Sequence, residues 1–438
     1  MAGGDETEAD LTGGTQRRRP RSQPKVLGGR RLSPATLMMG HGFDPALSEG
    51  ALKPPIFLTS TFVFESAAAG KRHFEQVTGK RAGAAEGLVY SRFNGPNQEI
   101  LEGRLGIWED AEEALTFSSG MAAIATLLLA YVKPGDVIVH SAPLYAATET
   151  LIGKILGRFG VTWLDFPAGA TREEIDAVLD RAKKQGRVAL LYLESPANPT
   201  NALVDIEAVA AARNAAFPDE LPPIAIDNTF LGPLWQKPLS RGADIAVYSL
   251  TKYAGGHSDL VAGAAVGAKA MIDPIRAMRN TIGTITDPHT AWMLLRSLET
   301  LELRMTRASE NAAKVCDYLR GHPKVEQVGY LGFLAEDSRQ ADIYRRHCTG
   351  AGSTFSLYLK GGEREAFAFL DALKIAKLAV SLGGTETLAS APAAMTHLSV
   401  PDDRKAALGI TENLVRISIG VEDAGDLIAD MEQALAAI

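Results

Sequence analysis

The stretch "YSLTKYAGGHSDLVAG", residues 248–263, places a lysine directly after a short apolar run and before a glycine-rich turn. The run that leads into it, "GADIAVY" (242–248), has the composition of a buried strand. A charged side chain at the end of such a strand is costly unless it is paired, neutral or used covalently. Lys252 therefore needs a chemical reason for its position, and the rest of the chain must supply it.

Around this stretch, short apolar runs alternate with helical patterns, as in 171–185 and 205–217. The runs are continuously apolar, which indicates strands buried on both faces of a mainly parallel sheet covered by helices. The pattern predicts an α/β architecture. Seven runs are predicted to be strands: "ALTF" (114–117), "DVIVH" (136–140), "VTWLDF" (161–166), "VALLYLE" (188–194), "PIAIDN" (223–228), "ADIAVYS" (243–249) and "VAGAAVGA" (261–268).

The C-terminal part has a different pattern. A long helical stretch over 288–322 precedes fewer strands, and the pattern predicts a smaller α+β domain. Its predicted strands are 353–360, 378–383 and 414–420, and its predicted helices are 363–374 and 425–438. The chain is thus expected to divide into a disordered tail (1–32), an N-terminal arm (33–94), a cofactor domain (95–290) and a C-terminal domain (291–438). The tail is rich in charge and poor in aliphatic side chains, so it buries too little apolar surface to offset its ordering entropy.

Composition narrows the function classes. The 438 residues are 46% apolar and 22% charged, as in an ordinary soluble globular protein. The net charge of −7 argues against nucleic-acid binding. Cys316 and Cys348 have neither disulfide-framework nor metal-site spacing, so no metal is expected. The longest apolar run, 121–132, is too short to cross a bilayer, and no secretory signal is visible, so the expected setting is the cytoplasm.

Polar residues follow several of the predicted strands, where ligands bind in doubly wound sheets. "SSGM" (118–121) starts a helical pattern and suits a phosphate, although an ordinary serine N-cap explains it equally well. Asn198, Asp227 and Lys252 end three other runs. Together these groups fit pyridoxal phosphate, which needs a lysine amine for a Schiff base, donors for its phosphate and an acid beside its ring nitrogen. The cofactor would explain Lys252.

Six motifs are similar to those of the Cys/Met-metabolism family of pyridoxal-phosphate enzymes, from about residue 35 to the C-terminus. The family contains cystathionine γ-synthases, cystathionine and methionine γ-lyases and homoserine-ester sulfhydrylases. The resemblance implies the aspartate aminotransferase type of fold (fold type I). The motifs are 248–263, "AIDNTF" (225–230), "LESPANPT" (193–200), "SSGM" (118–121), "YSR" (90–92) and "LVRISIGVED" (414–423).

The resemblance also implies roles for individual residues. Lys252 would form the Schiff base and carry protons, and Asp227 would pair with the ring nitrogen. Tyr145 would stack on the ring and act as an acid or base toward the leaving group. Arg416 would clamp the substrate carboxylate. The remaining implied contacts are the phosphate with Ser119, Gly120, Met121, Ser249 and Thr251, the ring hydroxyl with Asn198, and either Arg416 or Lys252 with Ser381.

The resemblance further implies that Tyr90 and Arg92 reach the phosphate of a neighbouring subunit. A dimer would then be the smallest catalytic unit, and a homotetramer built as a dimer of dimers is expected. His257 has no visible partner for catalysis, and we interpret it as structural. A nicotinamide oxidoreductase is disfavoured because no G-x-G-x-x-G turn joins an early strand to a helix. A non-catalytic binding protein is disfavoured because Lys252, Asp227 and Tyr145 are all present.

Three departures bear on the reaction. Val380 stands where family members that handle cystathionine usually carry glutamate, and an apolar residue there resembles methionine γ-lyases and sulfhydrylases. Ala147 stands where many methionine γ-lyases have a cysteine. "FNGPN" (93–97) and the long stretch 70–87 differ from the usual pattern near the substrate entrance. We favour a carbon–sulfur lyase acting by γ-elimination on methionine or homocysteine. The alternative is γ-replacement on an activated homoserine ester, by a cystathionine γ-synthase or sulfhydrylase, and cystathionine γ-lyase is the least favoured.

Overall fold

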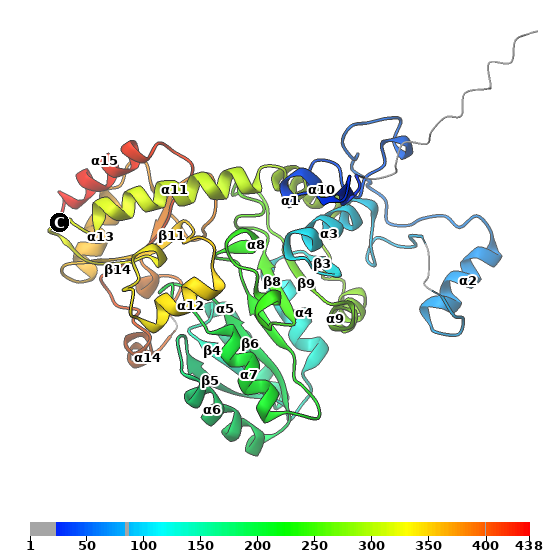
Figure 1. Cartoon of the computed structure of the whole chain (residues 1–438), viewed down its shortest axis with the longest axis horizontal. Coiled ribbons are helices and arrows are strands. Elements are labelled where there is room, and N and C mark those ends of the chain that lie inside the picture. The colour runs from blue at the N-terminus through cyan, green and yellow to red at the C-terminus, as the bar shows by residue number, and fades with distance from the viewer. Residues whose placement is uncertain (1–22, 84–86, 399) are drawn as a thin grey trace, which may run out of the picture.

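A seven-stranded sheet forms the centre of the larger domain in the computed structural model, which describes residues 23–83, 87–398 and 400–438 (Figure 1). Its strand order is β3-β9-β8-β7-β6-β4-β5. Only β9 runs antiparallel to its neighbours, so the predicted mainly parallel sheet is confirmed. All seven predicted strands form: β3 (Glu113–Phe117), β4 (Val137–Ala142), β5 (Thr162–Pro167), β6 (Val188–Glu194), β7 (Ile224–Asp227), β8 (Ile245–Ser249) and β9 (Gly263–Gly267).

Helices cover both faces of this sheet, which explains why its strands are apolar throughout. One core lies between the sheet and α3, α6, α7 and α10, and includes Leu101, Leu179 and Leu294. The core on the other face lies under α4 and α9, and includes Leu127 and Ile272. The helices are α3 (Pro96–Glu109), α4 (Gly120–Tyr131), α6 (Arg172–Gln185), α7 (Ile206–Ala216), α9 (Lys269–Ile282) and α10 (Pro288–Leu298).

The parallel strands end at one edge of the sheet, and this edge carries the polar residues of the motifs. β3, β6, β7 and β8 all point the same way, so the segment after Phe117 lies on the same edge as Glu194, Asp227 and Ser249. β9 starts at this edge, with Gly263 paired to both Phe117 and Ser249. The topology thus brings together residues that are far apart in the sequence.

The C-terminal domain packs helices against a second, five-stranded sheet of order β10-β11-β14-β13-β12 (Figure 1). Its strands are β10 (Val325–Gly329), β11 (Thr354–Leu359), β12 (Lys377–Leu378), β13 (Leu388–Ser390) and β14 (Leu414–Ser418). Its helices are α11 (Leu301–Leu319), α12 (Arg339–His347), α13 (Glu363–Ala372), α14 (Asp402–Ala407) and α15 (Ala424–Leu435). No helix in the described residues has the length and apolarity needed to cross a membrane.

Two predicted elements differ from the structure. The helical stretch 288–322 is divided at Thr300 into α10 and α11, where the Arg304 guanidinium donates to the Ser297 carbonyl oxygen at 2.9 Å. The predicted strand 378–383 is limited to β12, because Ser381 adopts a left-handed φ of 103° that a strand cannot contain. β10 and β13 were not predicted, since β10 is half exposed and β13 has three residues.

The N-terminal segment forms an arm that projects from the body with α2 at its far end (Figure 1). Residues 1–22 of the predicted tail lie outside the described residues. Residues 23–32, also assigned to the tail, contain a short hairpin tied to the body by an ion pair between Arg31 and Asp110. The arm contains β1 (Val26–Leu27), β2 (Arg30–Arg31), α1 (Pro34–Leu37), η1 (Pro45–Leu47) and α2 (Ala67–Val77). The remaining short helices are α5 (Ala146–Thr150), η2 (Leu151–Ile155), η3 (Leu156–Phe159), α8 (Gly232–Trp235), η4 (Pro238–Arg241), η5 (Leu331–Phe333) and η6 (Pro392–Ala394).

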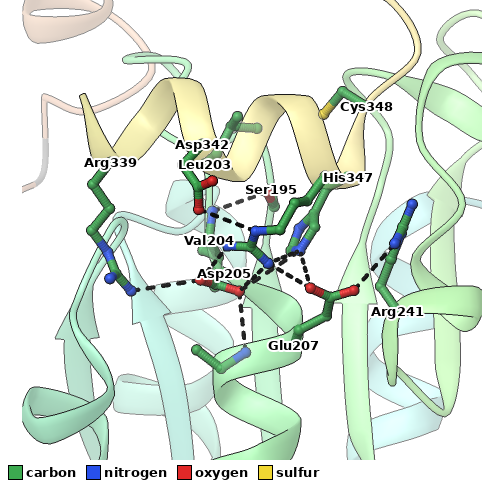
Figure 2. A network of polar contacts seen from close by, with 12 residues as sticks. Ser195, Leu203, Val204, Asp205, Glu207, Arg241, Arg339, Asp342, His347 and Cys348 are labelled. Carbon is green, nitrogen blue, oxygen red and sulfur yellow. Dashed lines mark hydrogen bonds and ion pairs between the residues drawn. The ribbon is translucent and has the colours of Figure 1, made fainter. Parts of the chain in front are cut away.

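A charged network joins the two domains where α12 lies over the start of α7 (Figure 2). The Arg346 guanidinium contacts Asp205 through Nη2 at 2.7 Å and also donates to Glu207. Ligand atoms of Asp205, Glu207 and His347 lie within 4.8 Å of one another, a spacing that could hold a metal ion. The Arg346 guanidinium already bonds both carboxylates and lies 3.2 Å from His347 Nε2, so we interpret the network as an interdomain ion-pair cluster.

Arg346→Ala is expected to lower the stability of the folded chain by about 2 kcal/mol, because it leaves Asp205, which is mostly buried, without its strongest partner. In thermal unfolding of the purified protein this corresponds to a midpoint lower by about 2 to 4 °C. The matched control is Arg345→Ala on the same helix, since Arg345 is exposed and, among the described residues, bonds only the Glu336 carbonyl oxygen. Equal shifts for both variants would contradict the assignment.

Candidate active site

A cavity of about 330 Å³ opens at the carboxyl edge of the large sheet and is lined by both domains. Residues at the ends of β6, β7 and β8 form one wall, and Val380, Ser381 and Arg416 come from the C-terminal domain. All the predicted site residues line this cavity except Tyr90 and Arg92. The fold therefore gathers the predicted residues after position 118 around one space, while the role of each stays a prediction.

Lys252 lies in the turn after β8 and points to the C-terminal domain. Its Nζ donates to Ser381 Oγ at 2.7 Å. Burial and the nearby Arg416 charge lower the pKa of Lys252 to about 8, and Asp227 opposes both effects. A lysine with this pKa loses its proton near neutral pH far more readily than a surface lysine, as a nucleophile or base must.

Asp227 ends β7 on the floor of the cavity. Its Oδ1 accepts the Thr229 backbone N–H at 3.0 Å and the Thr229 hydroxyl at 2.5 Å. Burial raises the pKa of the Asp227 carboxyl, while the Thr229 bonds and the Lys252 charge lower it. A buried carboxylate with a free oxygen is suited to pair with a cationic ring nitrogen.

The segment after β3 forms a cradle for an anion. Ser119 is the N-cap of α4, and its hydroxyl accepts the Ala122 N–H at 2.9 Å, so the N-cap interpretation of this serine is confirmed. The cap leaves the start of the helix facing the cavity, where Gly120 and Met121 line the wall with Ser249. Glycine is required at Gly120, because an added Cβ would lie 3.0 Å from the Ser249 Cβ.

A second glycine keeps this cradle narrow. A Cβ on Gly263 would lie 2.2 Å from the Ser119 carbonyl oxygen, which no side chain can tolerate. Thr251 lies on the opposite side, with its hydroxyl bonded to the backbone N–H and carbonyl oxygen of Ala262. The combination of a helix start and hydroxyls is typical of phosphate sites.

Arg416 is a buried cation with no ion pair to a carboxylate among the described residues. Its side chain is held by neutral acceptors, the Asn198 Oδ1 at 3.0 Å and the Ser381 carbonyl oxygen at 2.8 Å. Its Nε has no hydrogen-bond partner within the part of the chain that the structure describes. Burial lowers the pKa of Arg416 to about 10. Such a guanidinium has the capacity to bind an incoming carboxylate.

Tyr145 lies in the loop between β4 and α5, at the mouth of the cavity. It is 41% exposed, so its ring is free to contact a ligand. Its backbone N–H donates to the Glu194 carboxylate at 2.7 Å. His257, interpreted as structural, bonds the Gly255 carbonyl oxygen through Nδ1 at 2.7 Å.

Tyr90 and Arg92 lie outside the cavity of their own chain. Tyr90 forms a bridge with Thr61, and Arg92 donates to the Asn280 carbonyl oxygen. Their place outside this cavity is consistent with the expectation that Tyr90 and Arg92 serve the site of another copy. That role stays a prediction.

Sequence reasoning missed three polar residues that line the cavity: Glu194, Thr229 and Thr396. Glu194 ends a completely buried strand, which is the same signal that pointed to Lys252. Thr229 follows Asp227 by two residues and holds it in place.

The cavity suits one cofactor by the chemistry of its donors. Lys252 would provide an amine for an aldehyde, Asp227 would provide an acid for a ring nitrogen, and the start of α4 would provide donors for a phosphate. The fold and the site thus define a pyridoxal-phosphate-dependent enzyme.

Comparisons with known proteins place it more closely. The model of the Cys/Met metabolism PLP-dependent enzyme family matches residues 35–436. An L-methionine gamma-lyase of Fusobacterium nucleatum subsp. polymorphum is 40% identical over 390 residues, covering 88% of this chain and 94% of the relative. A cystathionine gamma-lyase of Bacillus subtilis (strain 168) is 35% identical over 404 residues, covering 91% of this chain and 98% of the relative. A crystal structure of cystathionine gamma synthase from Xanthomonas oryzae pv. oryzae has a TM-score of 0.83 at 32% identity, covering 93% and 99%. This chain belongs to the Cys/Met metabolism family of pyridoxal-phosphate-dependent enzymes.

Uptake of pyridoxal phosphate by the cofactor-free protein is expected to accelerate as the pH rises and to level off above about pH 8. The reason is that the pKa of Lys252 is lowered to about 8, and only its neutral amine attacks an aldehyde. The growth of the visible absorption band after mixing measures the rate. A rate that keeps rising past about pH 9.5 would mean that Lys252 has the pKa of an ordinary surface lysine.

Proposed function

We propose that this enzyme is a carbon–sulfur lyase that acts by γ-elimination on methionine, homocysteine or a related amino acid. The products would be 2-oxobutyrate, ammonia and a thiol. The observation that supports the proposal most is Val380, which lines the cavity and is 57% exposed. An apolar side chain there suits a thioether or thiol and offers no partner for a second ammonium group.

The proposed roles follow from the contacts of each side chain. When bound, pyridoxal phosphate withdraws electrons from the substrate and makes its Cα and Cβ protons acidic. Arg416 binds the substrate carboxylate, and Lys252 Nζ moves protons at Cα and Cβ. Tyr145 gives a proton to the sulfur as the Cγ–S bond breaks. Water then releases 2-oxobutyrate and ammonia, which balances the reaction.

Ser381 gives these roles a common frame. Its hydroxyl accepts from Lys252 and its carbonyl oxygen accepts from Arg416, so one residue positions both the base and the carboxylate-binding group. Ser381 has a left-handed φ of 103°. Its hydroxyl and its carbonyl oxygen therefore do not point in the directions that they would have in a regular strand.

The second candidate is γ-replacement, in which an incoming thiol displaces the acyl group of a homoserine ester. The similarity to the cystathionine gamma synthase structure favours it, as does Ala147, which is not the cysteine of many methionine γ-lyases. The same residues would serve both reactions until the Cγ substituent leaves. Access of water or of a thiol would then decide the product.

We also propose that the catalytic unit contains two copies of the chain. The arm carries exposed apolar side chains, such as Val63 (96% exposed) and Leu58, which a second copy would bury. In such a dimer Tyr90 and Arg92 would add a hydroxyl and a cation to the phosphate cradle of the partner. Lys252 and Arg416 are the two cations among the described lining residues. A phosphate in the cradle would therefore gain a further positive charge from the partner's arm.

One assay separates the two candidate reactions. Methionine, homocysteine, cystathionine and O-succinylhomoserine are each supplied with and without cysteine, and 2-oxobutyrate and thioether product are measured. 2-Oxobutyrate from methionine or homocysteine, unaffected by cysteine, is expected. Cystathionine formed from the ester and cysteine would overturn the lyase proposal.

Val380→Glu is expected to raise the relative rate on cystathionine by about tenfold or more, since it adds a partner for the distal ammonium.

A further inference from the structure

Glu194 is the cavity residue whose charge the proposed mechanism leaves unexplained. It is the last residue of β6 and is 5% exposed. In the sheet it lies opposite Asp227, so two carboxylates sit on neighbouring strand ends. A second buried carboxylate beside Asp227 is electrostatically costly, and a stabilising contact must offset it.

The contacts of Glu194 are both to backbone N–H groups of active-site loops. Its Oε2 accepts the Tyr145 N–H at 2.7 Å, and its Oε1 accepts the Asn198 N–H at 3.0 Å. The two loops come from different strands, β4 and β6, and Glu194 is the side chain that bonds to both. The backbone N–H of Glu194 donates to the Ser141 hydroxyl at 3.0 Å, so the backbone of Glu194 is held in place as well. We call the two carboxylate bonds, to Tyr145 and to Asn198, the Glu194 bridge.

The bridge reaches two groups of the proposed mechanism. Tyr145 is the proposed proton donor to the leaving sulfur. Asn198 holds Arg416 through its Oδ1 at 3.0 Å, and Arg416 is the proposed carboxylate-binding group. Tyr145 itself precedes α5, and this helix has no side-chain cap of its own at its start.

We propose that Glu194 is a positioning residue that sets the separation between Tyr145 and the Asn198–Arg416 pair by bonding both loops with its two carboxylate oxygens. This inference rests on the proposed function for the roles of Tyr145 and Arg416. It does not depend on which substrate is used.

Opposing effects act on the Glu194 carboxyl. Burial and the neighbouring Asp227 raise the pKa of Glu194 to about 8, while the two backbone donors lower it. The two backbone donors thus favour the ionised form, in which both oxygens accept in full. Glutamine cannot replace it, because its amide NH₂ would face one of the two N–H donors.

Glu194→Gln in the cofactor-loaded enzyme is expected to lower kcat/KM by about 10- to 100-fold, the usual cost of removing a group that orients active-site residues. The cofactor content should stay unchanged, since the phosphate cradle is untouched. The visible circular dichroism of the bound cofactor should decrease, because the ring of Tyr145 is no longer held over it. The matched control is Glu149→Gln, whose carboxylate lies near the same loop, 3.5 Å from the Leu144 N, without reaching Asn198.

Hydrogen exchange tests the bridge directly and needs no substrate. Glu194→Gln should increase amide exchange in residues 141–147 and 195–201 together, whereas Glu149→Gln should affect the first segment alone. If Glu194→Gln does not fold, the shorter Glu194→Asp, which reaches at most one of the two amides, replaces it. Unchanged exchange in both segments, or an equal loss of activity in the Glu149 variant, would overturn the inference. Absence of lyase activity in the parent enzyme with the exchange result intact would instead count against the proposed function.

Discussion

Replacing Lys252 by alanine is expected to lower kcat/KM by about four orders of magnitude, because in the proposed mechanism this one side chain is both the covalent anchor of the cofactor and the base. The visible absorption band that borohydride removes from the parent enzyme should be missing from the variant. Arginine is no substitute at this position. Lys252→Arg keeps a positive charge beside Ser381, but a guanidinium does not lose its proton at neutral pH, so this variant should be equally inactive.

The controls separate loss of chemistry from loss of structure. Lys269→Ala changes an exposed lysine on α9 that forms an ion pair with Asp273, and the activity of this variant should match that of the parent. Substantial activity in Lys252→Ala would show that another amine anchors the cofactor and acts as the base.

The same variant also tests the proposed dimer. Lys252→Ala and Arg92→Ala should each be inactive as separate proteins. If Arg92 serves the partner's site, a mixed dimer contains one site with both residues intact. Random mixing of the two variants should then restore about a quarter of the parent activity. No recovery of activity after confirmed subunit exchange would show that Arg92 does not act in the partner's site.

Replacing Arg416 by alanine is expected to lower kcat/KM by about a hundred- to a thousandfold, with a larger effect on KM than on kcat. Arg416 is buried and lines the cavity, and among the described residues its guanidinium has no carboxylate partner. Losing one partner of a buried, hydrogen-bonded charge pair typically costs about 3 to 4 kcal/mol. Arg416→Lys should recover little, because an ammonium cannot form the two parallel bonds of a guanidinium fork.

Substrate analogues make this prediction specific. The parent enzyme should strongly prefer methionine over its carboxamide, and Arg416→Ala should lose most of that preference. Arg404→Ala is the control: this arginine also belongs to the C-terminal domain, but it pairs with Asp165 outside the cavity. A retained preference for the carboxylate in Arg416→Ala would assign carboxylate binding to another group.

Local pattern was sufficient to predict the large sheet. Its strands are mostly apolar, so the burial of the central strands on both faces can be inferred without knowing their neighbours, while the edge strand β5 is largely exposed. Lys252 and Asp227 were singled out for the same reason, since each is a charged residue at the end of such a run. Glu194 carries the same signal, but it was included only as the last residue of a predicted strand.

The tertiary structure decided how these residues work together. The Lys252–Ser381 and Arg416–Asn198 bonds join residues 129 and 218 positions apart, and no local pattern encodes such a contact. Distant segments likewise contact Ser381, which has a left-handed φ, and the helix break at Thr300, where Arg304 donates to the Tyr253 carbonyl oxygen. The sequence by itself determined the strands, the cofactor and the lysine that is predicted to anchor it, because burial and charge are local properties. Only the fold decided the positions of Arg416 and Glu194, because their geometry depends on how loops from separate strands and domains meet.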